Sequence, residues 1–305
     1  MTTVLIAGST GMLGTRIAHH LLAQPAVNVR LLVRPSARQD PDKAQTLADL
    51  ENLGATVVLG DVSDPAALDQ ATLGADVVIS ALQGDRSVIV DGQIALAEAA
   101  VRSGVRRFFP SDFALNLFEA PEGAPMFDLR READGAIDTM GLEVVHVING
   151  AFMDMMLDPQ TAGIVDLTTD SARLWGTGDE EFNLTTVDDT ARFTALLATD
   201  PDNVAGVRTI SGSQTSFNRI ITETERLIGR RLTTEVLGSS ADLRRITAAS
   251  DNPWAVIMEW YFLSMITVSP STGEDANRYP QLKLTTLDDF LSAAHQAHNQ
   301  THQTS

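Results

Sequence analysis

Residues 3–14 read TVLIAGSTGMLG, a short apolar run followed by three closely spaced glycines. The run has the composition of a buried β-strand, and Ile17, Leu21 and Leu22 continue at helical spacing after the glycines. A strand that turns through glycines directly into a helix brings backbone N–H groups to a pyrophosphate at the positive end of the helix dipole. Glycines also occur in tight turns without a ligand, but a second apolar run at 27–33 completes a βαβ unit here. The stretch therefore predicts a dinucleotide-binding turn.

The alternation of apolar runs and helical patterns continues to residue 150. Further strands are predicted at 55–59, 75–80, 106–109 and 143–148, and helices near 42–53, 65–73, 86–103 and 127–141. Short apolar strands that alternate with helices form a parallel sheet with helices on both faces. The predicted fold class is α/β, a Rossmann-like doubly wound parallel sheet.

The pattern loosens after residue 150. Shorter strands are expected at 163–168, 172–174, 182–184 and 207–211, and helices at 187–199, 215–228, 239–249 and 252–267. We expect a dinucleotide-binding domain over 1–150 and a smaller α/β region over 151–298 that closes the substrate pocket. The polar residues 299–305 are expected to form a frayed tail.

The second predicted strand indicates which dinucleotide binds. An acidic residue about 20 residues after the glycines would hold the ribose of NAD, whereas an arginine there accommodates the 2′-phosphate of NADP. This strand ends in Arg34, followed by Arg38. The sequence favours NADP(H), with Arg34 as the phosphate partner and Arg38 or Arg16 as helpers, while solvated surface arginines remain the alternative.

Composition narrows the class of protein. The 305 residues carry a formal net charge of −18, which disfavours nucleic acids and anionic membranes as partners. Apolar runs are too short for a membrane span, and the first strand begins too early to leave room for a signal peptide. The chain has no cysteine. We therefore expect a cytoplasmic enzyme-sized protein, and a homodimer is left open.

Several motifs together carry a family resemblance. The glycine turn, the strand that ends in Val33-Arg34-Pro35, the stretch GDVSD at 60–64 and above all GVRRFFPSDF at 104–113 resemble the NmrA-like family. The likeness is to its isoflavone reductase and phenylcoumaran benzylic ether reductase branch, which consists of atypical short-chain dehydrogenases. It extends more weakly to about residue 290.

The resemblance implies roles for individual residues. Gly8, Thr10, Gly11, Met12, Leu13 and Gly14 would line the pyrophosphate, Arg34 would meet the 2′-phosphate, and Asp61 with Val62 would meet the adenine. Ser80, Ala81 and Gln83 would lie beside the nicotinamide ribose, and Ser111 and Phe113 beside the nicotinamide. Asn149, Phe152 and Met153 would face the substrate.

One departure from the family pattern concerns the chemistry. The reductase branch carries an essential lysine in a Phe-x-x-Lys setting, and alignment of Phe127-Asp128-Leu129-Arg130 places Arg130 there. An arginine stays protonated, so it can anchor an oxygen but cannot shuttle a proton at neutral pH. Arg130, Ser111 and Asp112 are the catalytic candidates, and protons would come from water or from Asp112, Asp154 or His146.

Three functions remain open on the sequence. The chain is expected to be an NADP(H)-dependent reductase of a small hydrophobic, aromatic or quinone-like substrate. The first alternative is a non-catalytic redox sensor that binds the dinucleotide and a protein partner. The second is an enzyme that keeps the cofactor but carries out non-redox chemistry such as an isomerisation.

The histidines are read as structural. His146 lies in the middle of a predicted strand between valines, which favours a hydrogen-bonded core histidine over a base. His295, His298 and His302 have the spacing of one helix face but no nearby carboxylate in sequence. No metal site is expected.

Overall fold

The computed structural model describes residues 1–158 and 160–303, with the course of the backbone alone from residue 297 on. The chain forms two compact units, which we call the first and the second unit. The first contains residues 1–113, 128–147 and 190–208, and the second contains residues 114–127, 148–189 and 209–305. This division differs from a single boundary near residue 150, because the segments 114–127 and 190–208 each fold with the other part of the chain.

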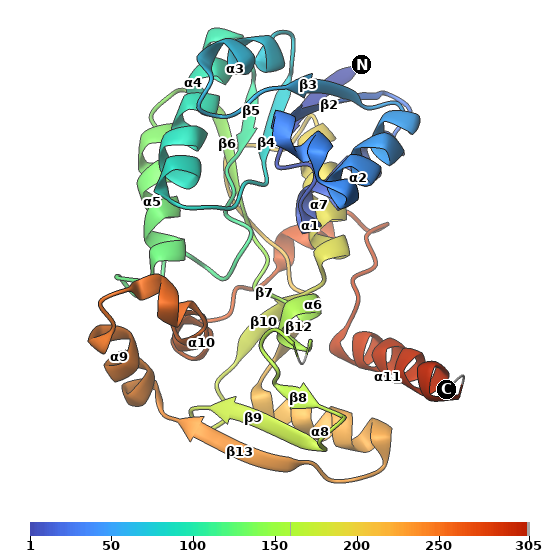
Figure 1. The fold of residues 1–305 in the computed structure, drawn as a ribbon, viewed down its shortest axis with the longest axis vertical. Helices are drawn as coiled ribbons and strands as arrows, with labels where there is room; N and C mark the ends of the chain where they lie inside the picture. The colour runs from blue at the N-terminus through green and yellow to red at the C-terminus, as the bar shows by residue number, and fades with distance from the viewer. Residues whose placement is uncertain (159, 304–305) are drawn as a thin grey trace. The chain divides into compact units, whose positions relative to one another are not determined.

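A seven-stranded sheet forms the centre of the first unit (Figure 1). Its order is β11 (Gly206–Thr209), β6 (Glu143–Ile148), β5 (Arg107–Phe109), β4 (Val77–Ser80), β1 (Thr2–Ala7), β2 (Val27–Val33) and β3 (Thr56–Leu59). The central strand β1 pairs in parallel with β2 on one side and β4 on the other. The strand order therefore reverses at β1, the place where a doubly wound sheet opens a crevice for a ligand.

Helices cover both faces of this sheet, as the sequence predicts. They are α1 (Met12–Leu22), α2 (Pro41–Asn52), α3 (Pro65–Thr72), α4 (Gln93–Arg102), α5 (Pro125–Ile137) and α7 (Val187–Thr199). On one face, Leu5 and Phe108 of the sheet pack with Leu68, Leu96 and Ile137 of α3, α4 and α5. Short helical turns precede α2 and α4, namely η1 (Pro35–Gln39) and the π-helix η2 (Ser87–Gly92). The α/β doubly wound prediction is confirmed.

A buried guanidinium fixes β5 to the segment that follows α7. Arg107 is fully buried, and its side chain donates hydrogen bonds to the backbone oxygens of Leu197 at 2.8 Å, Asp200 at 2.8 Å and Asn203 at 2.7 Å. Its Nε also donates to Glu143 at 3.1 Å. Carbonyls at a helix end have no partner within the helix, and Arg107 satisfies that of Leu197 in the last turn of α7 together with those of Asp200 and Asn203 beyond it.

The second unit carries two three-stranded sheets. One has the order β12 (Ser213–Thr215), β10 (Phe182–Thr185) and β7 (Ala151–Phe152), and the other β13 (Thr233–Gly238), β9 (Ser171–Trp175) and β8 (Val165–Asp166). The accompanying helices are α6 (Met153–Met156), α8 (Phe217–Ile228), α9 (Ser240–Ala249), η3 (Pro253–Val256), α10 (Ile257–Thr267), η4 (Glu274–Arg278) and α11 (Leu287–Gln303). The rings of Phe182 and Phe217 lie 5.1 Å apart in its core.

The end of the chain differs from the expected frayed tail. Helix α11 continues to Gln303, so residues 299–303 are helical, and residues 304–305 of the expected tail lie outside the described residues. None of the helices in the described part of the chain combines the length and the apolar composition of a bilayer span.

Candidate functional site

The glycines between β1 and α1 allow three backbone segments to approach closely. Gly8 has a φ of +87°, and a Cβ atom on it would lie 2.4 Å from the carbonyl oxygen of Ala81. A Cβ atom on Gly14 would lie 2.3 Å from the oxygen of Gly8. Only glycine is compatible with this turn at both positions, because a side chain would collide with backbone that cannot move aside.

The same turn has the properties that a bound pyrophosphate requires. Gly11 is the exposed residue at the N-cap of α1, and no side chain in the described chain accepts from the first-turn N–H groups. A Cβ atom on Gly11 would have only the backbone oxygen of Gly8 within 4 Å, at a tight 3.3 Å, so this position is less crowded than Gly8 or Gly14. The hydroxyl of Ser9 is buried without a hydrogen-bond partner among the described residues. These features fit the diphosphate of a dinucleotide, whose oxygens accept such donors.

Charged side chains follow the ends of β2 and β3. Arg38 donates two hydrogen bonds to Glu51, at 2.7 and 3.1 Å. Arg34 is exposed, and its charge acts on Asp61. The pKa of Asp61 lies below its ordinary value, mainly because Ser63 donates hydrogen bonds to its carboxylate. The charge of Arg34 lowers this pKa to a lesser degree. Arg34 is thus the better placed partner for a phosphate, because the guanidinium of Arg38 already has a carboxylate.

The ends of β4 and β5 are joined by Ser111. Its hydroxyl donates to the oxygen of Leu82 at 2.7 Å, and its N–H donates to the side chain of Gln93 at 2.8 Å. Gln93 is fully buried and donates in turn to Ile89 of the π-helix at 2.8 Å. Leu82 and Gln93 were not predicted as site residues. Gln93 could have been identified from the sequence, because it is a glutamine on the buried face of a helix.

The candidates around Ser111 differ in exposure. Val62, Ser80 and Phe113 are buried, whereas Gln83 is exposed. Ser80 pairs with Ala7 of β1, and the N–H of Ala81 donates to the oxygen of Ala7 at 2.8 Å. The predicted residues at the ends of β1, β4 and β5 therefore come together at one edge of the sheet, and their roles toward a cofactor stay predictions.

Arg130 reaches this edge from α5. Its Nε donates to the backbone oxygen of Ser111 at 2.6 Å, and its side chain is half-buried. A charge-assisted bond of this length fixes the guanidinium beside the end of β5. The structure thus places a permanent cation beside the end of β5, and its correspondence to the family's lysine stays a prediction.

A cluster of titratable side chains lies behind Ser111. His146 on β6 bonds through Nδ1 to Asp112 at 2.8 Å and through Nε2 to Asp138 at 3.2 Å. Asp134 on α5 is buried, and oxygen or nitrogen atoms of Asp112, Asp134 and His146 all lie within 4.8 Å of one another. We call Asp112, Asp134, Asp138 and His146 the carboxyl–histidine cluster. His146 is a hydrogen-bonded core histidine, as predicted.

The cluster perturbs the protonation of its members. Burial raises the pKa of Asp134 to about 9, and the charges of Asp112 and Asp138 act in the same direction. Burial also raises the pKa of Asp112, against the hydrogen bond from His146. For His146, burial lowers the pKa, but hydrogen bonds and charges from Asp112 and Asp138 exceed that effect and raise it.

Sequence reasoning named Asp112 and His146 but not their partners Asp134 and Asp138. Arg130, Asp134 and Asp138 follow one another at four-residue spacing, which places the first two on one face of α5 and Asp138 just beyond its last residue. That face also carries the buried Ile137. Charged residues on an apolar helix face are the signal that could have identified the cluster.

The second unit holds the residues expected to face the substrate. Asn149, Phe152 and Met153 are all buried, and the side-chain oxygen of Asn149 has no hydrogen-bond partner among the described residues. Thr185 donates to the backbone oxygen of Asn149 at 2.6 Å. Their contact with a substrate stays a prediction.

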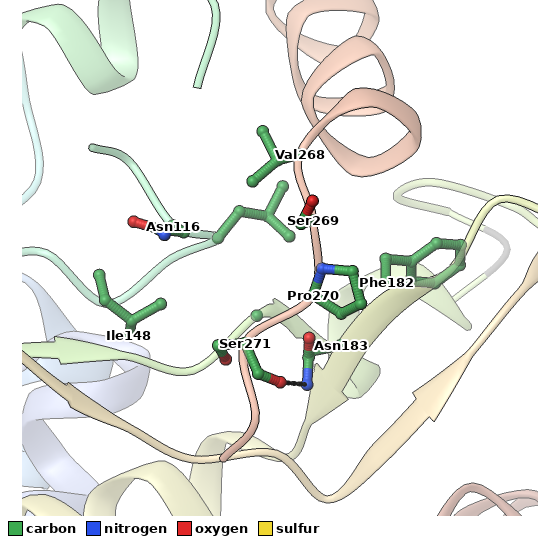
Figure 2. Close-up of a pocket in the computed structure, with 10 residues that line it drawn as sticks. Asn116, Ile148, Phe182, Asn183, Val268, Ser269, Pro270 and Ser271 are labelled. Carbon is green, nitrogen blue, oxygen red and sulfur yellow. Dashed lines mark hydrogen bonds between the residues drawn. The ribbon is translucent and has the colours of Figure 1, made fainter. Parts of the chain in front are cut away.

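A small pocket in the same unit has a cavity volume of about 10 Å³ (Figure 2). Asn183 donates a hydrogen bond to the oxygen of Ser271 at its wall, at 3.0 Å. The remaining walls are largely apolar and come from Leu115, Ile148, Phe182, Val268 and Pro270, with Asn116 as a further polar group. A space of this size holds about one water molecule and is too small for an organic ligand.

Comparisons with known proteins agree with this arrangement. The sequence model of the NmrA-like family matches residues 1–291. The isoflavone reductase homolog IRL of Zea mays is 30% identical, and the match covers 95% of this chain and 97% of the relative. The phenylcoumaran benzylic ether reductase PT1 of Pinus taeda is 26% identical, and the match covers 95% of this chain and 97% of that relative.

Solved structures share the fold. The structure titled "AtPrR2 with NADP+ and (+)pinoresinol" has a TM-score of 0.81 at 25% identity and covers 96% of this chain and 98% of that one. The leucoanthocyanidin reductase–NADPH complex from Vitis vinifera has a TM-score of 0.80 at 23% identity, over 95% and 98%.

Proposed function

The chain belongs to the NmrA-like family, and we propose that it is an NADP(H)-dependent reductase of a small hydrophobic, aromatic or quinone-like substrate. Relatives that match nearly the whole chain are named as an isoflavone reductase homolog, a pinoresinol reductase and a phenylcoumaran benzylic ether reductase. The observation that carries the proposal is the hydrogen bond of 2.6 Å between Arg130 Nε and the oxygen of Ser111. It fixes a cation at the end of β5, where an oxygen of cofactor or substrate would need an anchor.

In this proposal some residues of the site bind the cofactor and others take part in proton transfer. The turn from Gly8 to Gly14 and Arg34 would hold the diphosphate and the 2′-phosphate. When bound, NADPH supplies a hydride. Arg130 orients an oxygen without giving up its proton, because a guanidinium stays charged. Asp112, whose pKa burial raises, would supply the proton.

The reaction class is tested by NADPH consumption with purified protein and a panel of quinones and aromatic enones. Saturable consumption is the expected result. Tight NADPH binding without turnover across the panel would contradict the proposal and favour a sensor that acts through a protein partner. Substrate conversion without net loss of NADPH would instead show non-redox chemistry.

The cofactor assignment is tested by a matched pair of variants. Arg34→Ala is expected to weaken NADPH binding by roughly 10- to 100-fold, since a hydrogen bond to a charged group contributes about 1.5–3 kcal/mol. NADH, which lacks the 2′-phosphate, should bind with unchanged affinity. Arg38→Ala is the control because Arg38 is paired with Glu51. Equal losses for both cofactors would show that the phosphate lies elsewhere.

A further inference from the structure

We propose that the carboxyl–histidine cluster is a proton store and relay, in which Asp134 is a neutral carboxylic acid and Asp138 connects the cluster to solvent. Asp134 is 2% exposed, and neither of its carboxyl oxygens has a hydrogen-bond partner among the described residues. An ionised carboxylate in such a position would lose its hydration without compensation. A proton on Asp134 removes that cost.

The charges around the cluster lead to the same assignment. The groups that face it are Asp112 after the end of β5, Arg130 and Asp134 from α5, Asp138 just beyond α5, and His146 from β6. With His146 protonated between two carboxylates, two cations face three carboxyl groups. Asp112 and Asp138 each bond to the imidazole ring, whereas Asp134 does not. Asp134 is therefore the group that keeps a proton.

The geometry supplies a route for that proton. Asp138 has half of its side chain exposed and lies 3.2 Å from Nε2 of His146. Nδ1 of the same ring lies 2.8 Å from Oδ2 of Asp112, which is fully buried. An imidazole can take a proton at one nitrogen and release another from the second. A proton can thus pass from solvent through Asp138 and His146 to Asp112, next to Ser111.

This role rests on the proposed function. Reduction adds two electrons and one hydrogen to the substrate as a hydride, and one further proton completes the product. We assign that proton to Nδ1 of His146, which passes it through Asp112 to the substrate, while Asp138 returns a solvent proton to Nε2 of the ring and Asp134 keeps its own proton. One solvent proton is consumed for each hydride. The relay would replace the proton transfer that Arg130 cannot perform. Asp134, Asp138 and His146 are positioning residues in this scheme.

The proton on Asp134 is tested without substrate or cofactor. The infrared spectrum of the protein at pH 7 should contain the carbonyl stretch of a buried carboxylic acid, and Asp134→Asn should remove it. Glu132→Gln is the matched control, since Glu132 lies on the same helix but is half-exposed and paired with Arg86. Absence of the band in the wild-type protein, or its persistence in Asp134→Asn, would overturn the assignment.

A divalent cation is the competing occupant of the cluster. Its carboxylates and imidazole are of the types that bind Zn²⁺ or Mn²⁺, but the charge of Arg130 acts on both buried carboxyls and opposes a second cation. We expect added Zn²⁺ or Mn²⁺ to leave the acid band unchanged. Stoichiometric binding that removes the band, and that Asp134→Asn abolishes, would show a metal site instead.

The relay is tested by turnover of any substrate that the panel identifies. Asp138→Asn, at the exposed end, is expected to lower kcat by roughly tenfold and raise the solvent deuterium isotope effect, with KM unchanged. Asp138→Glu should restore the rate. Unchanged kcat in Asp138→Asn would refute the relay. An acid band without turnover on any substrate would refute the proposed function and leave the proton on Asp134 established.

Discussion

Replacement of Asp134 by asparagine changes the pH dependence of stability in a direction that follows from its burial. Asparagine has the same shape but cannot ionise. In the folded protein the pKa of Asp134 is raised to about 9, mainly by burial, whereas in the unfolded chain it returns to its ordinary value of about 3.9. Between these two values the folded protein holds one proton more than the unfolded chain. The free energy of unfolding therefore falls as the pH rises through this window.

The expected size follows from that one proton. Each pH unit within the window removes about 1.4 kcal/mol from the wild type but nothing from Asp134→Asn at this site. From pH 5 to pH 8 the difference between the two proteins should grow by up to about 4 kcal/mol, in favour of the variant. Because Asp112 and Asp134 titrate together, we expect at least about 2 kcal/mol of this. His146, whose pKa is also raised, loses its stabilising contribution as the pH rises in both proteins, so its effect cancels.

Urea unfolding followed by far-ultraviolet circular dichroism at pH 5, 6, 7 and 8 measures this difference. Tryptophan fluorescence would not serve, since Trp175, Trp254 and Trp260 all lie in the second unit and Asp134 lies in the first. Glu132→Gln should give a curve parallel to the wild type. Parallel curves for wild type and Asp134→Asn, or a difference that shifts toward the wild type as the pH rises, would refute the reasoning.

Three further predictions concern other parts of the first unit. Arg107→Met should lower the free energy of unfolding by about 3–5 kcal/mol in urea, because it leaves several buried carbonyls without a donor; a loss under 1 kcal/mol would contradict this. Gly8→Ala should destabilise the fold by more than about 1 kcal/mol, whereas Gly11→Ala should cost less stability and should weaken NADPH binding in calorimetry; a Gly11→Ala variant that binds NADPH as the wild type does would exclude a phosphate site at this turn. Arg130→Ala should lower kcat by roughly 10- to 100-fold and Arg130→Lys should retain or raise it; an unchanged rate in both would place Arg130 outside the site.

The central strands of the first unit, such as β1 and β4, could be predicted because their residues are mostly apolar and buried on both faces. Leu5 and Phe108 are fully buried, and such runs between helical patterns have few alternatives to a parallel sheet. Strand β13 was missed for the opposite reason. Five of its six residues are exposed, so its sequence carries no burial pattern. Its place is set by parallel pairing with β9, which sequence periodicity does not reveal.

The candidate site was predictable where backbone conformation dictates the residue. Gly8 requires a positive φ and close approach to Ala81, and a glycine is the only residue that satisfies both. The carboxyl–histidine cluster was not predictable, since Asp112, Asp134 and His146 belong to three separate segments. What brings them together is the pairing of β5 with β6 and the packing of α5 against the sheet, as Ile137 and Phe108 show.

The path of the chain between the two units limits how this protein can be divided. The first unit needs residues 190–208, and the second needs residues 114–127 from the middle of the other unit's sequence. Any single cut therefore removes an essential segment from at least one unit; a fragment that ends at residue 150, for example, lacks the carbonyls that Arg107 binds. Neither unit can be inherited or exchanged as one continuous gene fragment. Variation in substrate is consequently expected to arise through substitutions and loop changes within the whole chain, and not through recombination of its halves.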